Sequence, residues 1–185
     1  VCSSPLPGVE PGDETGLTAV LTETKARSAE ELKRNISGIE CCLSDFQTYT
    51  PVRFTDKPEE YSQYWAIRSG IFPSVGGTRK PGTTCLIEDV ALPEATAELQ
   101  QLIARHGYED ACIYGHALEG NYHFILNQSF SSDAEVKRYE DLMNDVKTLV
   151  VDRYDGSLKA EHGTGRNMAP FVRYEWGDAA YEVMK

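Results

Sequence analysis

A stretch of ten residues holds two of the four histidines of the chain. Residues Gly115–Phe124 read G-H-A-L-E-G-N-Y-H-F, which places His116 and His123 seven positions apart. In an uninterrupted strand such positions point to opposite faces, and Gly120-Asn121 disfavours a helix. We expect a bend or bulge that lets both imidazoles face one point, which suits a divalent metal ion. The alternative is two unrelated histidines, one in the core and one on the surface.

A second stretch, Ser157–Asn167, reads S-L-K-A-E-H-G-T-G-R-N and adds a carboxylate and a third histidine. Its glycines, Gly163 and Gly165, let the backbone adopt positive φ or approach a ligand closely. Together with the two imidazoles, Glu161 would complete a two-histidine, one-carboxylate site with open coordination positions, as in a catalytic metal site. His162 would then be a nearby base. The alternative for this pair is an exposed turn.

Two other residues could compete for these roles. Glu119 lies inside the first stretch and is a rival carboxylate ligand, which we interpret as an exposed residue of the bend. His106 ends the segment A-R-H-G, where an imidazole complements the dipole at the C-terminal end of a helix. We therefore predict a structural role for His106.

The elements that must position these residues mix helices and strands along the chain. Capping-box spacings begin helices at Ser28 and Ser132, and residues 17–23 alternate roughly as in a strand. Two further strands are interrupted near Glu119-Gly120. Those two strands are too close for a crossover helix, so they must pair antiparallel. We expect an α+β fold with a ferredoxin-like antiparallel sheet covered by helices. The predicted helices are 28–42, 58–71, 93–106, 132–154 and one from about 169; the predicted strands are 17–23, 46–54, 83–92, 110–117 and 121–127.

Composition limits the classes of protein to consider. The 185 residues suffice for one domain, and the Pro- and Gly-rich residues 1–15 are typical of a linker. A net charge of -11 argues against nucleic acid as a partner, and no apolar run is long enough for a membrane span. Five cysteines without a C-x-x-C pair favour reduced thiols in a cytoplasmic protein. Because the chain begins without Met and ends at Lys185 inside a helical pattern, we expect a piece of a longer protein.

Together the two stretches resemble the C-terminal domain of FAD-linked oxidases. The family pattern G-H-x-x-x-G-N-x-H matches residues 115–123, and G-S-x-x-A-E-H-G-x-G matches residues 156–165. A W-x-x-R pattern matches Trp65 and Arg68, and the resemblance covers roughly residues 16–185. The family includes D-lactate, glycolate and D-2-hydroxyglutarate dehydrogenases and is related to vanillyl-alcohol oxidase. Longer phrases, such as A-E-H-G-T-G-R-N-M-A-P-F, resemble large bacterial FAD and iron–sulfur D-2-hydroxyacid dehydrogenases.

The resemblance implies roles for individual residues. His116, His123 and Glu161 would be metal ligands, with zinc the usual assignment. His162 would be the acid/base, and Arg68 would hold the substrate carboxylate, a role that suits its bidentate fork.

The remaining roles are implied less directly, because this sequence departs from the hydroxyglutarate branch. A lysine and an asparagine expected there are replaced by Ile87 and Ile125. Lys80 and Asn127 would take over substrate binding, and Asn121 would contact the cofactor.

The resemblance also implies the rest of the protein and its reaction. An FAD-binding domain would precede this one, and a cysteine-rich part with a 4Fe-4S cluster would follow it. The whole would oxidise a 2-hydroxyacid by hydride transfer to FAD in the cytoplasm or at the periphery of the inner membrane, with the electron acceptor left open; the isolated chain would be inactive. Two alternatives remain: a stand-alone two-histidine, one-carboxylate metalloenzyme and a non-catalytic ferredoxin-like regulatory module.

Overall fold

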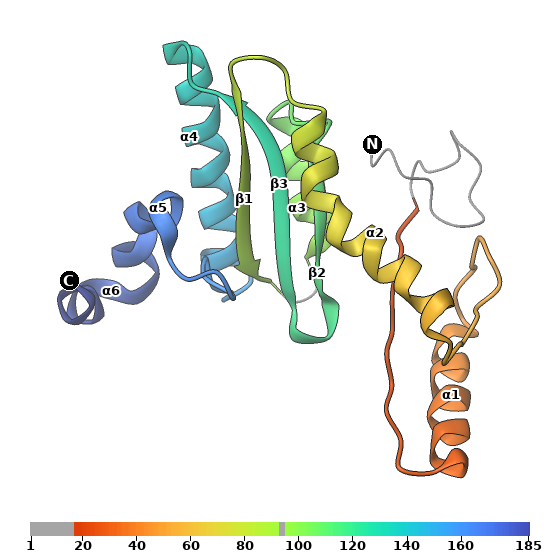
Figure 1. Cartoon of the computed structure of the whole chain (residues 1–185). Helices are drawn as coiled ribbons and strands as arrows, with labels where there is room; N and C mark the ends of the chain where they lie inside the picture. The colour runs from red at the N-terminus through yellow and green to blue at the C-terminus, as the bar shows by residue number, and fades with distance from the viewer. Residues whose placement is uncertain (1–16, 93–94) are drawn as a thin grey trace. The chain divides into compact units, whose positions relative to one another are not determined.

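A computed structural model describes residues 17–92 and 95–185 (Figure 1). The chain divides into an N-terminal unit that ends at Ile71 and a C-terminal unit that begins at Phe72. The predicted linker at residues 1–15 lies outside the described residues. Among the described helices, none combines the length and the apolar character needed to cross a membrane.

The N-terminal unit contains helix α1, Ala29–Leu43, and most of helix α2, Pro58–Gly77. Ser28 caps α1, because its hydroxyl accepts a hydrogen bond from the Glu31 N–H at 3.1 Å, as the capping box predicted. The predicted strands at 17–23 and 46–54 are wrong, since neither segment pairs with another strand. Alternating residues alone do not make a strand without a partner ladder.

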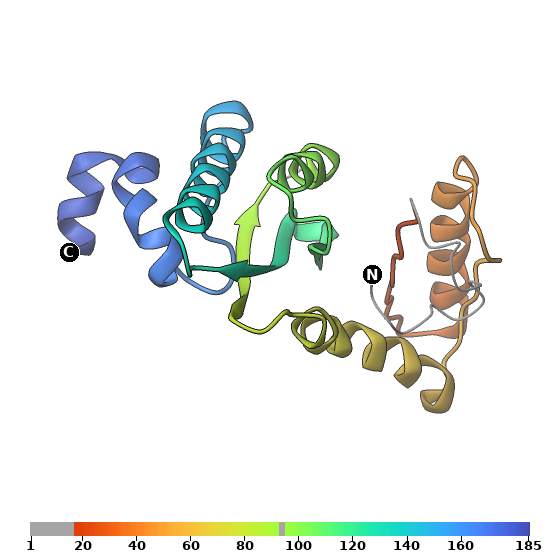
Figure 2. The same cartoon turned by 90° about the horizontal axis from the view of Figure 1, so that it is seen from above.

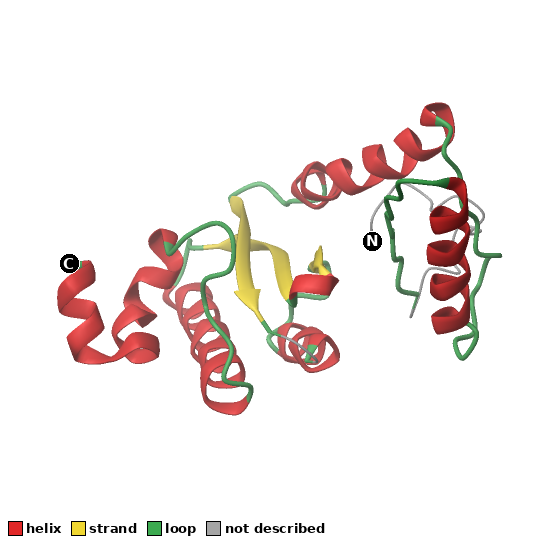
Figure 3. Cartoon of the chain, turned by 90° about the horizontal axis from the view of Figure 1, so that it is seen from below, coloured by secondary structure: helices red, strands yellow, loops and turns green. Residues whose placement is uncertain are grey.

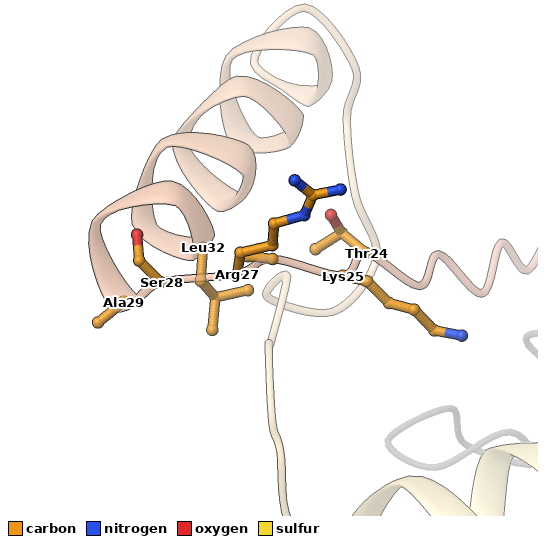
Figure 4. Close-up of a pocket in the computed structure, with 7 residues that line it drawn as sticks. Thr24, Lys25, Arg27, Ser28, Ala29 and Leu32 are labelled. Atoms are coloured by element: carbon orange, nitrogen blue, oxygen red, sulfur yellow. The ribbon is translucent and has the colours of Figure 1, made fainter.

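A hollow of about 530 Å³ lies where the chain enters α1 (Figure 4). None of the predicted site residues lines it. The lining residues are Thr24, Lys25, Ala26, Arg27, Ser28, Ala29 and Leu32.

The C-terminal unit is built on three antiparallel strands, drawn in yellow in Figure 3. These are β1, Thr83–Ala91, β2, Cys112–His116, and β3, Asn121–Ser129, in the order β1-β3-β2. A 3-10 turn, η1, Ala117–Glu119, joins β2 to β3 in a hairpin. The predicted antiparallel pair around Gly120 and the α+β fold class are both confirmed.

Two helices cover one face of this sheet: α3, Thr96–Arg105, and α4, Asp133–Lys147 (Figure 2). Alternate side chains of the strands, such as Val90 and Phe124, are fully buried against them. Each such side chain contributes roughly 1.5–3 kcal/mol to the stability of the fold. The same core includes Leu92, Leu99, Leu102, Ile103, Leu126, Leu142, Met143, Val146 and Val150.

The chain after α4 forms short helical pieces that border a loop. A π-helical turn, η2, Thr148–Arg153, continues α4, and after it a single bridge joins Ser157 to Ala91. Three further pieces follow: α5, Gly165–Met168, η3, Ala169–Phe171, and α6, Val172–Met184. The loop between η2 and α5 therefore begins by pairing with the end of β1.

At two glycines of the motifs, another segment of backbone passes too close for a side chain to fit. A Cβ atom on Gly115 would overlap the backbone of Asn121, and one on Gly156 would overlap the carbonyl oxygen of Ala91. Both contacts are with backbone, which cannot move aside as a flexible side chain can. Gly115 thus lets β2 close on β3, and Gly156 lets the loop close on β1.

We predict that Gly115→Ala lowers the free energy of unfolding by about 1–3 kcal/mol, because the added methyl group must displace the backbone of β3. Denaturant unfolding followed by circular dichroism measures this. Gly76→Ala is the matched control, since its Cβ would make an ordinary 3.7 Å contact with Cys85 Sγ. Equal stability of the two variants would contradict the close approach.

One ionisable side chain is buried against the helices. Glu88 on β1 is 5% exposed and accepts hydrogen bonds from Tyr139 Oη, at 3.0 Å, and from Asn167 Nδ2. Burial raises the pKa of Glu88 above its ordinary value of 4.5, although both hydrogen bonds act to lower it. Its ionisation therefore costs stability at neutral pH.

We predict that Glu88→Gln raises the free energy of unfolding at pH 7 by on the order of 1 kcal/mol. Denaturant unfolding of the variant and the wild type measures this difference. The folded state holds the carboxyl proton more tightly than the unfolded state, so wild-type stability falls as pH rises from about 4.5 through the folded-state pKa. The difference should vanish below about pH 4.5. Glu140→Gln, on the exposed surface of α4, is the control and should show no such trend.

Candidate functional site

The β2–β3 hairpin brings the two histidines of the first motif to one face of the sheet. His116 lies opposite Asn121, and Tyr114 lies opposite His123. Because cross-strand partners share a face and side chains alternate along a strand, His116 and His123 point the same way. Their ring centroids are 6.2 Å apart. The expected change of facing comes from a hairpin turn with Gly120 at φ 63°, instead of a bulge within one strand.

The carboxylate of Glu161 reaches both imidazoles. Its Oε1 lies 2.8 Å from His123 Nε2, and its Oε2 lies 3.5 Å from His116 Nε2. One ligand atom from each of the three residues lies within 4.8 Å of the others. This donor set, two imidazole nitrogens and a carboxylate oxygen, fits a divalent ion such as zinc.

One side of the donor set is open. The side chain of His123 is 1% exposed, whereas those of His116 and Glu161 are 47% and 42% exposed. A buried anchor with two half-exposed donors leaves room for a further ligand, as in catalytic metal sites.

His162 lies directly beside this set. Its ring stacks on that of His123 with centroids 4.6 Å apart and an interplanar angle of 22°. Its Nε2 lies 3.6 Å from Glu161 Oε1, and its side chain is 43% exposed. The imidazole is therefore accessible to a small molecule bound at the open side, where it could accept a proton.

The buried histidine is held in its neutral form. Burial lowers the pKa of His123, and this effect outweighs the opposing charge of Glu161. A neutral imidazole results, as metal binding requires. Its Nδ1 is buried without a hydrogen-bond partner among the described residues, which indicates that the ring proton lies on Nε2 toward Glu161; Nε2 must release that proton before it can bind a metal ion.

Asp89 is a site residue that the sequence interpretation missed. It lies on β1 opposite His123, is 3% exposed, and accepts hydrogen bonds from the backbone N–H groups of Glu161 and His162. With His123 and His162 it forms a second possible donor set. We favour the set with Glu161, because one oxygen of Asp89 is already occupied by two N–H groups. The adjacent acidic residues in the apolar strand C-L-I-E-D-V-A-L were the available signal.

The predicted binding residues do not all meet at this site. Asn121 is 9% exposed, and its Oδ1 has no hydrogen-bond partner among the described residues. Asn127 lies four positions beyond His123, roughly 13 Å along the strand. Its Nδ2 donates to the Val75 carbonyl oxygen and to Asp110 Oδ2, both at 3.1 Å, so it ties a loop and the end of α2 to the sheet.

The other predicted residues lie elsewhere on the chain. Lys80 is exposed in the turn before β1, at the end of the strand away from Asp89. Arg68 lies on α2 in the N-terminal unit, not in the unit that holds the histidines. Glu119 is exposed in η1, and His106 Nε2 lies 2.8 Å from Asp145 Oδ2 at the end of α3; both positions agree with the interpretation of these residues.

Comparison with known proteins gives the family. The family described as "FAD linked oxidases, C-terminal domain" matches residues 4–185. A D-lactate dehydrogenase [cytochrome] of Arabidopsis thaliana mitochondria is 29% identical over 71% of this chain and 24% of its own length. A D-2-hydroxyglutarate dehydrogenase of Xanthomonas citri pv. viticola is 26% identical over 79% of this chain and 31% of its own length.

A third relative, the glycolate oxidase subunit GlcD of Bacillus subtilis, is 22% identical over 94% of this chain and 37% of its own length. The chain thus spans between a quarter and two fifths of the curated relatives it matches. The match of the family covers nearly all residues, including both histidine motifs. The chain therefore belongs to the FAD-linked oxidases and contains their C-terminal domain.

Proposed function

We propose that this domain binds a divalent metal ion, zinc first among the candidates, through His116, His123 and Glu161. Within a longer flavoprotein it would form the substrate-binding half of a D-2-hydroxyacid dehydrogenase. The observation that carries the proposal is the convergence of these three donors beside His162. The names of the relatives support the substrate class, because D-lactate and D-2-hydroxyglutarate are both D-2-hydroxyacids.

The residues of this chain would share the work as follows. When bound, the metal ion would acidify the substrate hydroxyl, and the flavin would accept the hydride. His162 is proposed to take the hydroxyl proton, because its ring borders the open side of the donor set. His123 fixes the position of the set from the buried side.

Further contacts complete the proposal. Arg68 would bind the substrate carboxylate, whereas Lys80 and Asn127 lie too far along the sheet from the donor set to contact the same small substrate there. Asn121, whose Oδ1 is buried and has no hydrogen-bond partner among the described residues, would contact the cofactor. The FAD-binding domain, the iron–sulfur part and a cytoplasmic location remain predictions about the parent protein.

We predict that the chain binds about one zinc ion. We also predict that His123→Ala abolishes binding, because the buried imidazole of the donor set is lost. Isothermal titration calorimetry and metal analysis after dialysis measure this. His106→Ala is the matched control, since this histidine pairs with Asp145 outside the donor set. Zinc retained by His123→Ala but lost from His106→Ala would refute the ligand assignment.

In the full-length protein, we predict that His162→Ala lowers kcat by about 10²–10⁴-fold while zinc content stays unchanged, because the base is lost and the ligands remain. Steady-state kinetics with D-lactate and D-2-hydroxyglutarate measure the loss. Unchanged turnover would favour a regulatory module. Hydrolysis or oxygenation by the 185-residue chain alone would favour a stand-alone metalloenzyme.

A further inference from the structure

Asp89 presents an unusual electrostatic situation. It is 3% exposed, and no lysine or arginine among residues 17–92 and 95–185 forms an ion pair with it. A buried carboxylate without a cation is costly unless hydrogen bonds compensate its charge. The compensation comes from two successive backbone N–H groups, those of Glu161 and His162, which donate to Oδ2 at 2.6 and 2.8 Å.

Two consecutive N–H groups that converge on one anion form a backbone concavity of the kind that binds phosphate or carboxylate ligands. Here a side chain of the protein itself fills it. Hydrogen bonds to an ionised acceptor are shorter and roughly twice as strong as neutral ones. Asp89 therefore fixes the peptide units that carry the proposed carboxylate ligand and the proposed base.

The loop has few other attachments near these two residues. Its beginning is held by the pair of hydrogen bonds between Ala91 and Ser157, at 2.8 and 3.0 Å, by the Leu158 N–H, which donates to Glu175 Oε2 at 3.1 Å, and by the buried side chain of Leu158. Glu161, His162 and Gly163 are exposed, and Gly163 has φ +74°. Beyond Leu158, Asp89 is thus the anchor of Glu161 and His162.

The sheet makes this anchor specific to the site. Asp89 lies directly opposite His123 in the β1–β3 register, so the anchor of the loop and the buried donor are cross-strand partners. The same arrangement sets the 2.8 Å approach of Glu161 to His123 and the stacking of His162 on that ring.

We propose that Asp89 is the positioning residue of this site: it holds Glu161 and His162 over His123 without itself binding the metal ion. The consequence for metal affinity rests on the proposed function, whereas the backbone hydrogen bonds can be measured without any metal. Oδ2 is engaged by the two N–H groups, and Oδ1 lies 3.8 Å from His162 Nδ1. Asp89 would therefore contribute through the loop and not as a donor.

The test uses Asp89→Asn and Asp89→Ala in the 185-residue chain, with Asp145→Asn as a matched control on the surface of α4. Asparagine keeps the shape and one carbonyl oxygen, so a folded protein is available even if the alanine variant does not fold. The metal-free readout is the ¹H–¹⁵N spectrum, in which the amide protons of Glu161 and His162 should move upfield and exchange faster with solvent. The control should leave both amides unchanged.

The metal readout is affinity for Co²⁺, followed by its visible absorption. Asp89→Ala should weaken binding by about 10–100-fold, which is typical of losing a residue that orients metal ligands without binding the ion. One ion should still bind at saturation. Asp89→Asn should recover part of that loss, because its carbonyl oxygen can still accept both N–H groups.

Each contrary outcome is distinct. Unchanged amide signals in both variants would show that Asp89 does not hold the N–H groups of Glu161 and His162. Altered amide signals with wild-type Co²⁺ affinity would overturn its role in positioning the donors. Complete loss of Co²⁺ binding in Asp89→Asn, as in His123→Ala, would identify Asp89 as a ligand and also overturn it. If the wild type binds no Co²⁺, the proposed function fails, and the amide signals alone decide whether the anchor exists.

Discussion

The antiparallel pairing of β1 with β3 is the interaction on which both the fold and the candidate site depend. Its register places Val90 opposite Tyr122 and Asp89 opposite His123. The alternation of side chains therefore sends Val90 into the helix-covered core and Asp89 to the opposite face. A slip of one residue would turn Val90 and Phe124 away from α3 and α4 and turn Asp89 and His123 toward these helices. Burial of the core side chains thus fixes the register that places Asp89 beside His123.

Much of the fold could be predicted where a local signal decides the structure. Ser28 and Ser132 begin helices because their side chains cap exposed N–H groups, and this requires only neighbouring residues. The strands at 17–23 and 46–54 failed because pairing depends on a distant partner, which an alternating pattern does not supply. The helix α2 continues through Pro73 to Gly77, beyond the predicted end at residue 71. Packing and local context outweighed the breaking tendency of one proline.

The site shows the same division between local and distant information. The facing of His116 and His123 followed from their spacing and the turn between them. Glu161 was predicted as the carboxylate of the set from the second motif and from the resemblance, and the geometry brings it to both rings. Asp89 escaped notice because its partners are backbone N–H groups more than seventy positions away, as the separation of 72 residues from Glu161 shows. Hydrogen bonds to backbone leave no trace in residue types, so the sequence signals only that acidic residues lie in an apolar strand and not what they bind.

The three proposed donors become available at different stages of folding. The hairpin that carries His116 and His123 closes a short loop, whereas Glu161 must dock from about forty residues further along the chain, which costs more closure entropy. Local contacts form early and distant ones late in such topologies. An incompletely folded chain would therefore offer two imidazoles without the carboxylate. An ion that needs all three donors would bind the native state selectively and stabilise it by mass action, so metal loading would follow folding and discourage capture by misfolded chains.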